Sequence, residues 1–220
     1  MMCPLCEGYC ESRYQPRMDR RYLWCSECDL IHVPASDHVN LDTERKRYLS
    51  HNNSRNEPGY IRVLHSVILA AEAVTDKSSF DLLDFGCGYA PVLGELAQEK
   101  GHRVTNYDPI FFPQPDALKQ EYDVVTACEV AEHARDPVLF WERLASVVAP
   151  GGTLVVRSSL HPSAWDEFLL FWYTFDMTHV TFYSRVCVEY AARRFGFEPC
   201  SIDDPIWVMK KRSSACREPY

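Results

Sequence analysis

The pattern of apolar and polar positions predicts alternating strands and helices from residue 59 onward. An apolar run over residues 80–85 ends in a Gly-x-Gly turn, and residues 91–100 then place apolar side chains at helical spacing up to Gly101. A second candidate strand, residues 103–107, follows at once. Short apolar runs bounded by glycine indicate buried strands, and a 3.6-residue spacing indicates helices. Strand, glycine turn, helix and strand in this order predict a βαβ unit with parallel strands.

The same reasoning extends the fold on both sides of this unit. We expect further helices over residues 59–74, 138–148 and 185–195, and further strands over residues 124–128, 153–157, 200–202 and 206–209. Only about fifteen residues, three of them proline, lie between Asp108 and the strand 124–128. A helix, a strand and a second helix do not fit there. The sequence therefore predicts a parallel α/β sheet of about six strands with helices on both faces.

The first 34 residues hold two Cys-x-x-Cys pairs with eighteen residues between them. The four cysteines are Cys3, Cys6, Cys25 and Cys28. Each pair can form a tight knuckle, and two knuckles supply the tetrahedral set of thiolates that Zn²⁺ prefers. Cys10 is an alternative ligand, but it breaks the paired spacing. A redox role is disfavoured because neither pair opens a helix after a strand.

This cysteine pattern resembles a zinc ribbon and divides the chain into three parts. Ribbons usually have glycine directly after each pair, whereas this chain has Glu7 and Asp29. We expect residues 1–34 to form the zinc ribbon, residues 35–58 to form a polar connector, and residues 59–220 to form the α/β domain. The zinc is expected to be structural, since protein ligands fill all four of its positions.

Composition and charge narrow the range of functions. The chain has 23 Lys and Arg against 31 Asp and Glu, a net charge of −8, which disfavours general binding to nucleic-acid backbones. No segment approaches the roughly 20 apolar residues of a membrane span, and the N-terminal residues do not read as a signal peptide. The ten cysteines are therefore expected as cytoplasmic thiols or metal ligands. Core packing is expected for Cys87, Cys128, Cys187 and Cys200.

Four motifs in the α/β part resemble those of the class I S-adenosylmethionine-dependent methyltransferases. They are Asp84-x-Gly86-x-Gly88, Tyr107-Asp108-Pro109, Tyr122-Asp123-Val124-Val125 and Pro150-Gly151-Gly152-Thr153-Leu154. The resemblance spans roughly residues 60–200 and implies a Rossmann-like sheet, here with the family's third strand reduced or absent, and S-adenosylmethionine as cofactor. It argues against NAD, because Pro91 stands where a dinucleotide fingerprint has its third glycine.

The resemblance also implies where the cofactor binds. Gly86 and Gly88 would approach it with their backbone, and Asp108 would accept hydrogen bonds from both ribose hydroxyls. The full set of expected cofactor-binding residues is Asp84, Gly86, Cys87, Gly88, Asp108, Pro109, Cys128 and Glu129. Residues 48–60, which precede the first motif, are expected at the mouth of the site.

Glu129, Glu132 and His133 follow the strand 124–128 at positions i, i+3 and i+4, so a helix would place them on one face. This E-x-x-E-H pattern resembles the metal-binding element of the quinol O-methyltransferases of the ubiquinone pathway and of the small-RNA 3′-end 2′-O-methyltransferases. We match His179 to a further histidine of the RNA enzymes. The resemblance implies that these four catalytic candidates hold a magnesium-like ion that lowers the pKa of the acceptor hydroxyl. Without metal, His133 or His179 would be a general base whose tautomer the carboxylates fix.

Residues 158–183 form a long connection that is rich in aromatic side chains. These are Trp165, Phe168, Phe171, Trp172, Tyr173, Phe175, Phe182 and Tyr183. We expect this segment to be a lid that forms an apolar pocket for the acceptor. The sequence thus predicts methyl transfer, at oxygen, to a small aromatic or apolar molecule. An RNA-terminus 2′-O-methyltransferase, a sugar C-methyltransferase and a non-catalytic cofactor-binding subunit are the alternatives, and the acceptor and the oligomeric state stay open.

Overall fold

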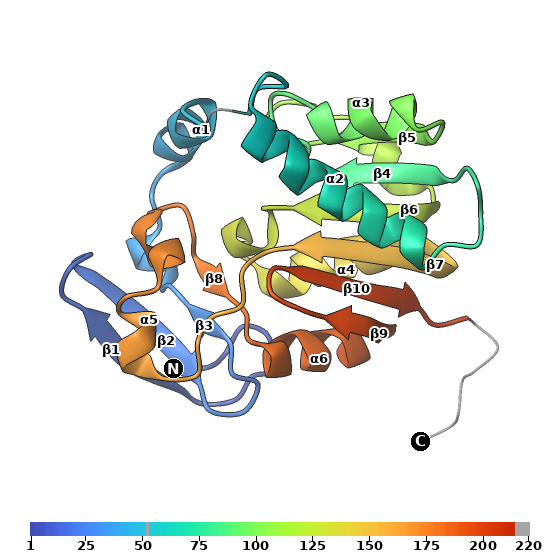
Figure 1. The fold of residues 1–220 in the computed structure, drawn as a ribbon. Coiled ribbons are helices and arrows are strands. Elements are labelled where there is room, and N and C mark those ends of the chain that lie inside the picture. The colour runs from blue at the N-terminus through green and yellow to red at the C-terminus, as the bar shows by residue number, and fades with distance from the viewer. Residues whose placement is uncertain (52, 214–220) are drawn as a thin grey trace.

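The computed structural model describes residues 1–51 and 53–213, and its centre is a six-stranded sheet (Figure 1). The strands are β4 (Asp81–Phe85), β5 (Arg103–Tyr107), β6 (Tyr122–Cys128), β7 (Val148–Arg157), β9 (Phe197–Ile202) and β10 (Ile206–Lys211), in the order β5-β4-β6-β7-β10-β9. The first four run parallel, whereas β10 is antiparallel to both of its neighbours. The expectation of an all-parallel sheet is wrong at this edge, because residues 203–205 are too few for the crossover that parallel strands need.

Helices cover both faces of this sheet, since successive side chains of a strand point to opposite sides. On one face, α2 (Pro58–Ala73) and α3 (Val92–Glu99) pack against Leu82 of β4. On the other face, α4 (Pro137–Val147) and α6 (Arg185–Arg194) share the apolar core with Leu83 of the same strand. These helices lie within one residue of the bounds expected from the sequence.

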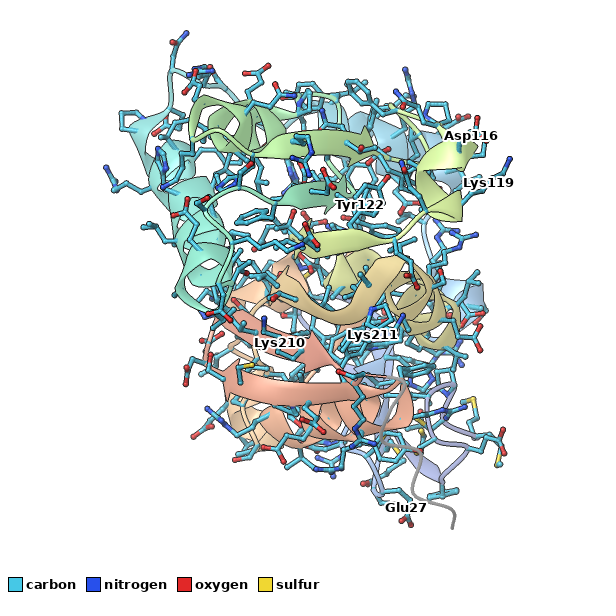
Figure 2. The ribbon with its side chains drawn as sticks, turned by 90° about the vertical axis from the view of Figure 1, so that its right-hand side faces the viewer. Glu27, Asp116, Lys119, Tyr122, Lys210 and Lys211 are labelled. Carbon is cyan, nitrogen blue, oxygen red and sulfur yellow. The ribbon has the colours of Figure 1, made fainter. Side chains whose placement is uncertain are left out.

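The segment between β5 and β6, residues 108–121, forms no strand; the structure describes all of it. It contains the 3₁₀ helix η2 (Pro115–Lys119) and a single bridge between Asp108 and Phe112. Figure 2 shows η2, marked by Asp116 and Lys119, near the start of β6 at Tyr122. The Tyr122 hydroxyl donates to the carbonyl of Ala117 at 3.1 Å and so ties η2 to that strand. The absence of the family's third strand is therefore confirmed.

Lys211 connects the edge of the sheet formed by β9 and β10 to the C-terminal end of α4 through hydrogen bonds. Lys211 lies on β10 with Lys210 (Figure 2). Its Nζ donates to the carbonyl oxygens of Ala145 and Val148 at 2.6 and 2.7 Å, where a cation is favourable because carbonyls are exposed at a helix C-terminus. Cys200 is exposed, contrary to expectation, because β9 is the edge strand of the sheet.

A second sheet lies beside the first and is built mainly from the N-terminal residues. Its strands are β1 (Cys10–Gln15), β2 (Arg20–Cys25), β3 (Ile31–His32) and β8 (Thr181–Phe182), in that order, with antiparallel pairing. β8 comes from the aromatic segment 158–183, which also contains α5 (Trp165–Phe168) and the 3₁₀ helix η4 (Trp172–Phe175). We call β1, β2 and β3 with their turns the N-terminal sheet. Figure 1 shows α5 and β8 next to it.

Several short helices lie outside the two sheets and outside the helices that cover the main sheet. A 3₁₀ helix, η1 (Ala35–Asp37), leads into α1 (Leu41–Leu49), whose N-cap Asn40 accepts from the amide of Thr43 at 2.9 Å. A further 3₁₀ helix, η3 (Ala131–His133), follows β6. Figure 1 shows α1 apart from the layered helices, above the end of the sheet where the loops after β4 and β5 lie. Residues 214–220 of the expected α/β domain are outside the described residues.

Candidate active site

The glycine turn after β4 is pressed against the loop that follows β6. Gly86 has a φ of +80°, and a Cβ added there would meet Val130 Cγ2 at 2.5 Å, so no larger residue fits. Its amide donates to the carbonyl of Tyr107 at 2.7 Å, which ties the turn to the end of β5. Gly88 also has a positive φ, +66°. The turn therefore presents its backbone, with little side-chain cover, to the space above the sheet.

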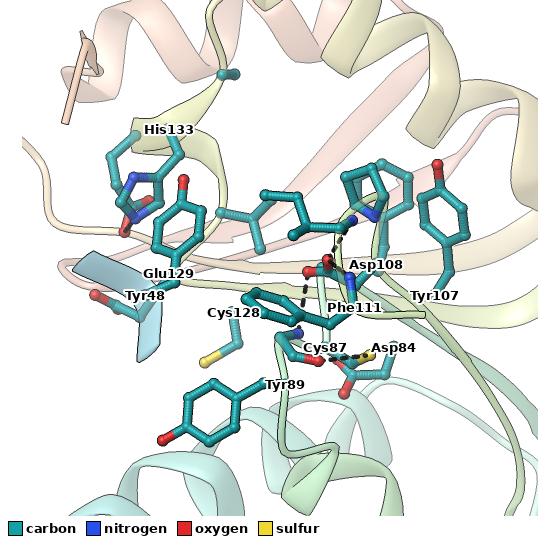
Figure 3. Close-up of a pocket in the computed structure, with 18 of the residues that line it drawn as sticks. Tyr48, Asp84, Cys87, Tyr89, Tyr107, Asp108, Phe111, Cys128, Glu129 and His133 are labelled. Carbon is teal, nitrogen blue, oxygen red and sulfur yellow. Dashed lines mark hydrogen bonds and ion pairs between the residues drawn. The ribbon is translucent and has the colours of Figure 1, made fainter. Parts of the chain in front are cut away.

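Asp108 lies directly opposite this turn at the tip of β5 (Figure 3). Its Oδ2 accepts from the Gly88 amide at 3.2 Å, and its Oδ1 accepts from the amides of Ile110 and Phe111 at 2.8 and 2.9 Å. These three bonds fix the carboxylate in one orientation. Each oxygen of an ionised carboxylate can accept more than one hydrogen bond, so Asp108 keeps acceptor capacity for a ligand.

Asp84 is the acidic residue beneath the turn, near the end of β4. It is buried, and its Oδ1 accepts from the Thr126 hydroxyl at 3.2 Å. Burial raises the pKa of this carboxyl to about 7, although the Thr126 hydrogen bond opposes the shift. A cation bound above the turn would favour the ionised form of this carboxyl.

A cavity of about 680 Å³ opens over these residues at the carboxyl ends of the parallel strands. All eight residues expected to bind the cofactor line it: Asp84, Gly86, Cys87, Gly88, Asp108, Pro109, Cys128 and Glu129. The expected mouth, residues 48–60, contributes Tyr48, His51, Asn53 and Tyr60. From segment 158–183 only His179 reaches the lining. The expectation that the aromatic residues of this segment line this cavity as an apolar pocket is therefore wrong. Phe168, Tyr173 and Phe182 are buried against the N-terminal sheet, Tyr183 lies in the core of the main sheet, and Trp172 and Phe175 are exposed.

Three of the four catalytic candidates meet beside the cavity. One ligand-type atom from each of Glu132, His133 and His179 lies within 4.8 Å of the others. His133 Nδ1 donates to the carbonyl of Thr178 at 3.1 Å, and His179 Nδ1 donates to the carbonyl of Tyr173 at 2.8 Å. Because a carbonyl only accepts, both neutral rings must carry their proton on Nδ1. The two Nε2 lone pairs are therefore free, and His133 Nε2 lies 4.0 Å from Glu132 Oε1.

Burial keeps both imidazoles neutral at ordinary pH. It lowers the pKa of His133 below its usual value, and it lowers the pKa of His179 to about 3, with the neighbouring His133 adding to that shift. The tautomers are set by backbone carbonyls, not by carboxylates as the sequence suggested. Both rings thus present an unprotonated nitrogen.

Glu129 lies beside this group in a different way from that expected. A helix does not place it on a common face with Glu132 and His133, since Glu129 has a φ of +57° and only the latter two lie in η3. Its Oε1 pairs with Arg157 Nη1. Burial, together with the nearby Glu132 carboxylate, raises the pKa of Glu129 to about 7, and Arg157 opposes the shift. The hydroxyl of Tyr173 joins the two carboxyls, at 3.3 Å from Glu129 Oε2 and 2.5 Å from Glu132 Oε1.

Sequence reasoning missed Tyr173, Ser158 and Arg157 as parts of this site. Ser158 donates to Glu132 Oε2 at 2.9 Å, so both oxygens of that buried carboxylate have a hydroxyl donor. Arg157 ends β7, the strand next to β6. The one indication in the sequence was the position of Arg157 at the end of a predicted strand, because residues at the carboxyl end of a parallel strand adjoin the ligand. Tyr173 stood among eight aromatic residues, and nothing distinguished it from them.

The helix α1 covers the cavity from outside. Glu44 Oε2 pairs with Arg135 Nη2 at 2.6 Å, and the Tyr48 hydroxyl donates to Glu44 Oε1 at 2.7 Å. The Tyr48 ring lies edge-on to His133 with 5.1 Å between centroids, and Figure 3 shows the two side chains together. On the far side, Arg47 Nε donates to Asp176 Oδ2 at 2.8 Å. Polar contacts therefore hold this cover over the cavity.

The four expected zinc ligands also meet at one point. The Sγ atoms of Cys3, Cys6, Cys25 and Cys28 all lie within 4.8 Å of one another. The residues that follow the two pairs, Glu7 and Asp29, have φ angles of 63° and 61°, the conformation that glycine usually supplies there. The amides of Gly8 and Glu27 point at the sulfurs of Cys6 and Cys25 at 3.4 Å. Such amide donors stabilise thiolates, so this cluster can hold a metal ion.

Comparison with known proteins places the chain in a family. Residues 31–202 match the family described as a methyltransferase domain, and the chain belongs to that family. Together with the fold, this makes it a class I S-adenosylmethionine-dependent methyltransferase. A solved structure with the same fold is the 1,6-didemethyltoxoflavin-N1-methyltransferase of Burkholderia thailandensis, with bound 1,6-didemethyltoxoflavin and S-adenosylhomocysteine. It has a TM-score of 0.56 at 14% identity, over 92% of this chain and 100% of that one.

Among curated proteins, the chain resembles two ubiquinone biosynthesis O-methyltransferases. The protein of Bradyrhizobium sp. (strain ORS 278) is 32% identical over 122 residues, which cover 46% of this chain and 47% of the relative. The protein of Aeromonas salmonicida (strain A449) is 28% identical over 137 residues, 49% of this chain and 57% of the relative. The chain thus spans about half the length of the curated relatives it matches. Among the described residues, no helix has the length and apolar character needed to cross a membrane.

Proposed function

We propose that this protein transfers the methyl group of S-adenosylmethionine to a hydroxyl oxygen of a small aromatic acceptor. The observation that carries the proposal is the pair of unprotonated imidazole nitrogens, on His133 and His179, beside the cofactor cavity. Methyl transfer to oxygen needs a group that takes or stabilises the proton of the hydroxyl. The likeness to ubiquinone biosynthesis O-methyltransferases supports the same chemistry.

The cavity residues fit this cofactor in charge and in shape. In our proposal the ribose hydroxyls donate to Asp108, and the backbone of Gly86 and Gly88 borders the methionine part. The buried Asp84 carboxyl lines the same cavity, and in its ionised form it would favour the cationic cofactor electrostatically. Glu129, His133 and Tyr48 line the same cavity, and we propose that the acceptor would bind beside them.

The proton of the acceptor has two possible routes that use the same residues. In the first, Nε2 of His133 accepts it directly, worth on the order of 10² to 10⁴ in rate; His179 is the weaker base because its pKa is lowered to about 3. In the second, Glu132, His133 and His179 hold a divalent cation that would lower the pKa of the hydroxyl. Two unprotonated imidazole nitrogens and a carboxyl oxygen within 4.8 Å of one another suit a cation, which would favour the ionised form of Glu132 although burial raises its pKa. Two imidazoles favour zinc, iron or manganese over the magnesium that the sequence pattern suggested.

We also propose that Cys3, Cys6, Cys25 and Cys28 bind structural zinc, as their mutual distances and turn geometry support. Residues 1–34 would then be the zinc module, residues 35–58 the connector and residues 59–220 the catalytic domain. The module shares apolar core with that domain, since Leu5 and Leu30 belong to the same buried cluster as Trp141. The metal would thus stabilise a part of the chain that has few apolar residues of its own.

The cofactor assignment is tested by the variant Asp108→Ala. Loss of two charge-assisted hydrogen bonds to the ribose, each worth about 1.5 to 3 kcal/mol, should weaken binding of S-adenosylhomocysteine at least tenfold in calorimetry. Asp116→Ala is the matched control, because Asp116 is exposed on η2 and should leave binding unchanged. Equal affinity of the Asp108 variant and the wild type would refute the ribose assignment.

The reaction itself is tested with caffeate, a catechol, as probe acceptor and labelled S-adenosylmethionine as donor. We expect label on a phenolic oxygen of caffeate, and a rate at least about 100-fold lower for a His133→Gln, His179→Gln double variant. Transfer that survives in the double variant would contradict the role of the two histidines. Chelation of the wild type followed by addition of single divalent cations separates the two proton routes.

A further inference from the structure

Residues 1–34 line no part of the cavity, yet they hold the segment that borders it. The contacts converge on residues 172–182, which carry Tyr173 and His179. This segment lies between the N-terminal sheet on one side and η3 with its catalytic candidates on the other. The position of the reactive groups therefore depends on elements far away in sequence.

Arg20 of β2 makes the most specific of these contacts. It is 7% exposed, and it donates from Nη1 to the carbonyl of His179 and from Nη2 to the carbonyl of Met177, both at 2.9 Å. Within residues 1–51 and 53–213, no carboxylate lies within the 4.0 Å of an ion pair with it. A buried guanidinium is costly unless hydrogen bonds compensate it, and here two backbone carbonyls of one turn accept from its two terminal nitrogens. Packing alone would be served by an apolar side chain.

Backbone pairing and apolar packing continue this contact along the segment. Ile31 and His32 pair with Phe182 and Thr181 as neighbouring strands, and the amide of Val33 donates to the carbonyl of Val180 at 2.8 Å. The aromatic rings of Tyr22, Phe168, Tyr173 and Phe182 form one buried cluster with these strands. The N-terminal sheet thus fixes both the ends and the middle of residues 172–182.

The opposite side of the same segment holds the site. Val180 donates its amide to the carbonyl of Glu132 at 2.8 Å, and the carbonyl of Thr178 accepts from His133. Tyr173 binds Glu132 through its hydroxyl and His179 through its carbonyl. A change in the turn at residues 177–179 would therefore move both imidazoles relative to Glu132.

We propose that the N-terminal sheet is a positioning element for methyl transfer and that Arg20 is its key positioning residue. By holding the carbonyls of Met177 and His179, Arg20 sets the direction of the His179 Nε2 lone pair. This inference rests on the proposed function, because it assigns Arg20 a role in the same reaction. A misplacement of about 1 Å in a reacting group costs as much as about 100-fold in rate, whereas the cofactor pocket contains no part of the sheet.

The test uses the full-length variants Arg20→Met, Arg20→Lys and Arg21→Met. Arg21 neighbours Arg20 on β2, but it is half-exposed and pairs with Asp37, so its variant is the matched control. We expect Arg20→Met to lower kcat for caffeate at least tenfold while the calorimetric affinity for S-adenosylhomocysteine changes less than twofold. Arg20→Lys should recover part of kcat, because an ammonium can donate to the same carbonyls. Arg21→Met should behave as wild type.

A spectroscopic measurement keeps this test independent of the acceptor. The ¹⁵N shifts of histidine-labelled protein report which ring nitrogen is protonated, and His179→Gln assigns the relevant signals by their loss. The Nδ1–H tautomer of His179 should be well defined in the wild type and in Arg21→Met, and averaged in Arg20→Met. If Arg20→Met does not fold, a weakened tautomer signal in Arg20→Lys is expected instead.

The proposed methyl transfer and the positioning role of Arg20 can be refuted separately. If the wild type transfers no methyl to caffeate, the proposed reaction is at fault, and the imidazole spectra still decide on Arg20. If Arg20→Met folds and keeps both the wild-type spectrum of His179 and the wild-type kcat, the positioning role is overturned. If it lowers kcat and cofactor affinity equally, the sheet supports the whole fold and has no specific role in catalysis.

Discussion

Residues 165–182 and α1 both contribute to the lining of the cavity near His133, and they are held in opposite ways. The first segment places Phe168, Tyr173 and Phe182 in a buried cluster with the N-terminal sheet. The second, α1, has Glu44 as its one buried residue among residues 41–49. Its attachments are the ion pairs of Glu44 with Arg135 and of Arg47 with Asp176. One neighbour of the cavity is packed by apolar area and the other is held by charges.

This difference corrects a common inference from sequence, namely that an aromatic-rich loop is a lid. Aromatic side chains bury large areas, each worth several kcal/mol when another element covers them. Here the N-terminal sheet covers Phe168, Tyr173 and Phe182, so we expect residues 165–182 to be a fixed wall, although Trp172 and Phe175 are exposed. The ion pairs of α1 join a largely buried carboxylate, on Glu44 or Asp176, to an arginine that is 37 to 45% exposed. Because water reaches the arginines and little apolar area holds the helix, we expect α1 to be the part of the enclosure that opens for ligands.

The largest expected effect comes from Cys25→Ser, because this change removes a proposed zinc ligand of the N-terminal sheet, on which the wall of residues 165–182 packs. Structural zinc contributes on the order of 10 kcal/mol in small zinc domains, and β2 ends at Cys25. We expect loss of bound zinc by metal analysis, a fall of at least about 3 kcal/mol in the free energy of unfolding, and rapid amide exchange in residues 165–182. Cys200→Ser, which changes an exposed cysteine, is the control. Unchanged zinc content and stability in Cys25→Ser would refute the zinc site.

A smaller effect is expected from Tyr173→Phe, which keeps the ring in the wall and removes its hydroxyl. Glu132 then loses a donor at 2.5 Å and Glu129 loses one at 3.3 Å. Removing one partner of a buried polar group costs about 1 to 3 kcal/mol, so the unfolding free energy should fall by that amount in denaturant titrations. The methyl-transfer rate should fall about tenfold. Tyr14→Phe removes an exposed hydroxyl from β1 as control; an equal loss in both variants would argue against a special role of Tyr173.

The smallest effect on stability is expected from Arg47→Ala, which breaks one attachment of α1. The Arg47 side chain is 45% exposed, and the 10% exposed carboxylate of Asp176 keeps two hydrogen bonds from Thr178, so loss of the pair should cost less than about 1 kcal/mol. The unfolding free energy should stay within about 0.5 kcal/mol of the wild type, while amide exchange in residues 41–49 becomes faster. Lys46→Ala on the same helix is the control. A destabilisation as large as that of Tyr173→Phe would mean that α1 belongs to the rigid part of the molecule.

Much of the fold follows from local patterns in the sequence. Apolar runs ending in glycine located β4 and its turn, and capping residues such as Asp136 located the helices. The short, proline-rich stretch after Asp108 correctly indicated a missing strand. These features depend on neighbours in sequence, so they are readable without coordinates. That the eight expected cofactor-binding residues line one cavity was readable for the same reason, because they lie at or just after the carboxyl ends of predicted strands.

The parts that could not be predicted depend on contacts between distant residues. Glu129 adopts a positive φ and pairs with Arg157, which no spacing rule for helices contains. Tyr173 approaches Glu132 only because the N-terminal sheet holds its segment. The aromatic residues looked available for a ligand because their partner, Tyr22, lies about 150 residues earlier in the chain. When an element from elsewhere in the chain buries a run of aromatic residues, those residues form part of the core and are not available to a ligand.

Amide hydrogen exchange of the wild type, with and without S-adenosylhomocysteine, compares residues 165–182 with α1 most directly. We predict slow exchange in residues 165–182 under both conditions, because the N-terminal sheet already protects them. We predict fast exchange in residues 41–49 of the free protein and a marked slowing when the ligand binds. Fast exchange in residues 165–182 that slows with ligand, with no change in residues 41–49, would contradict the account.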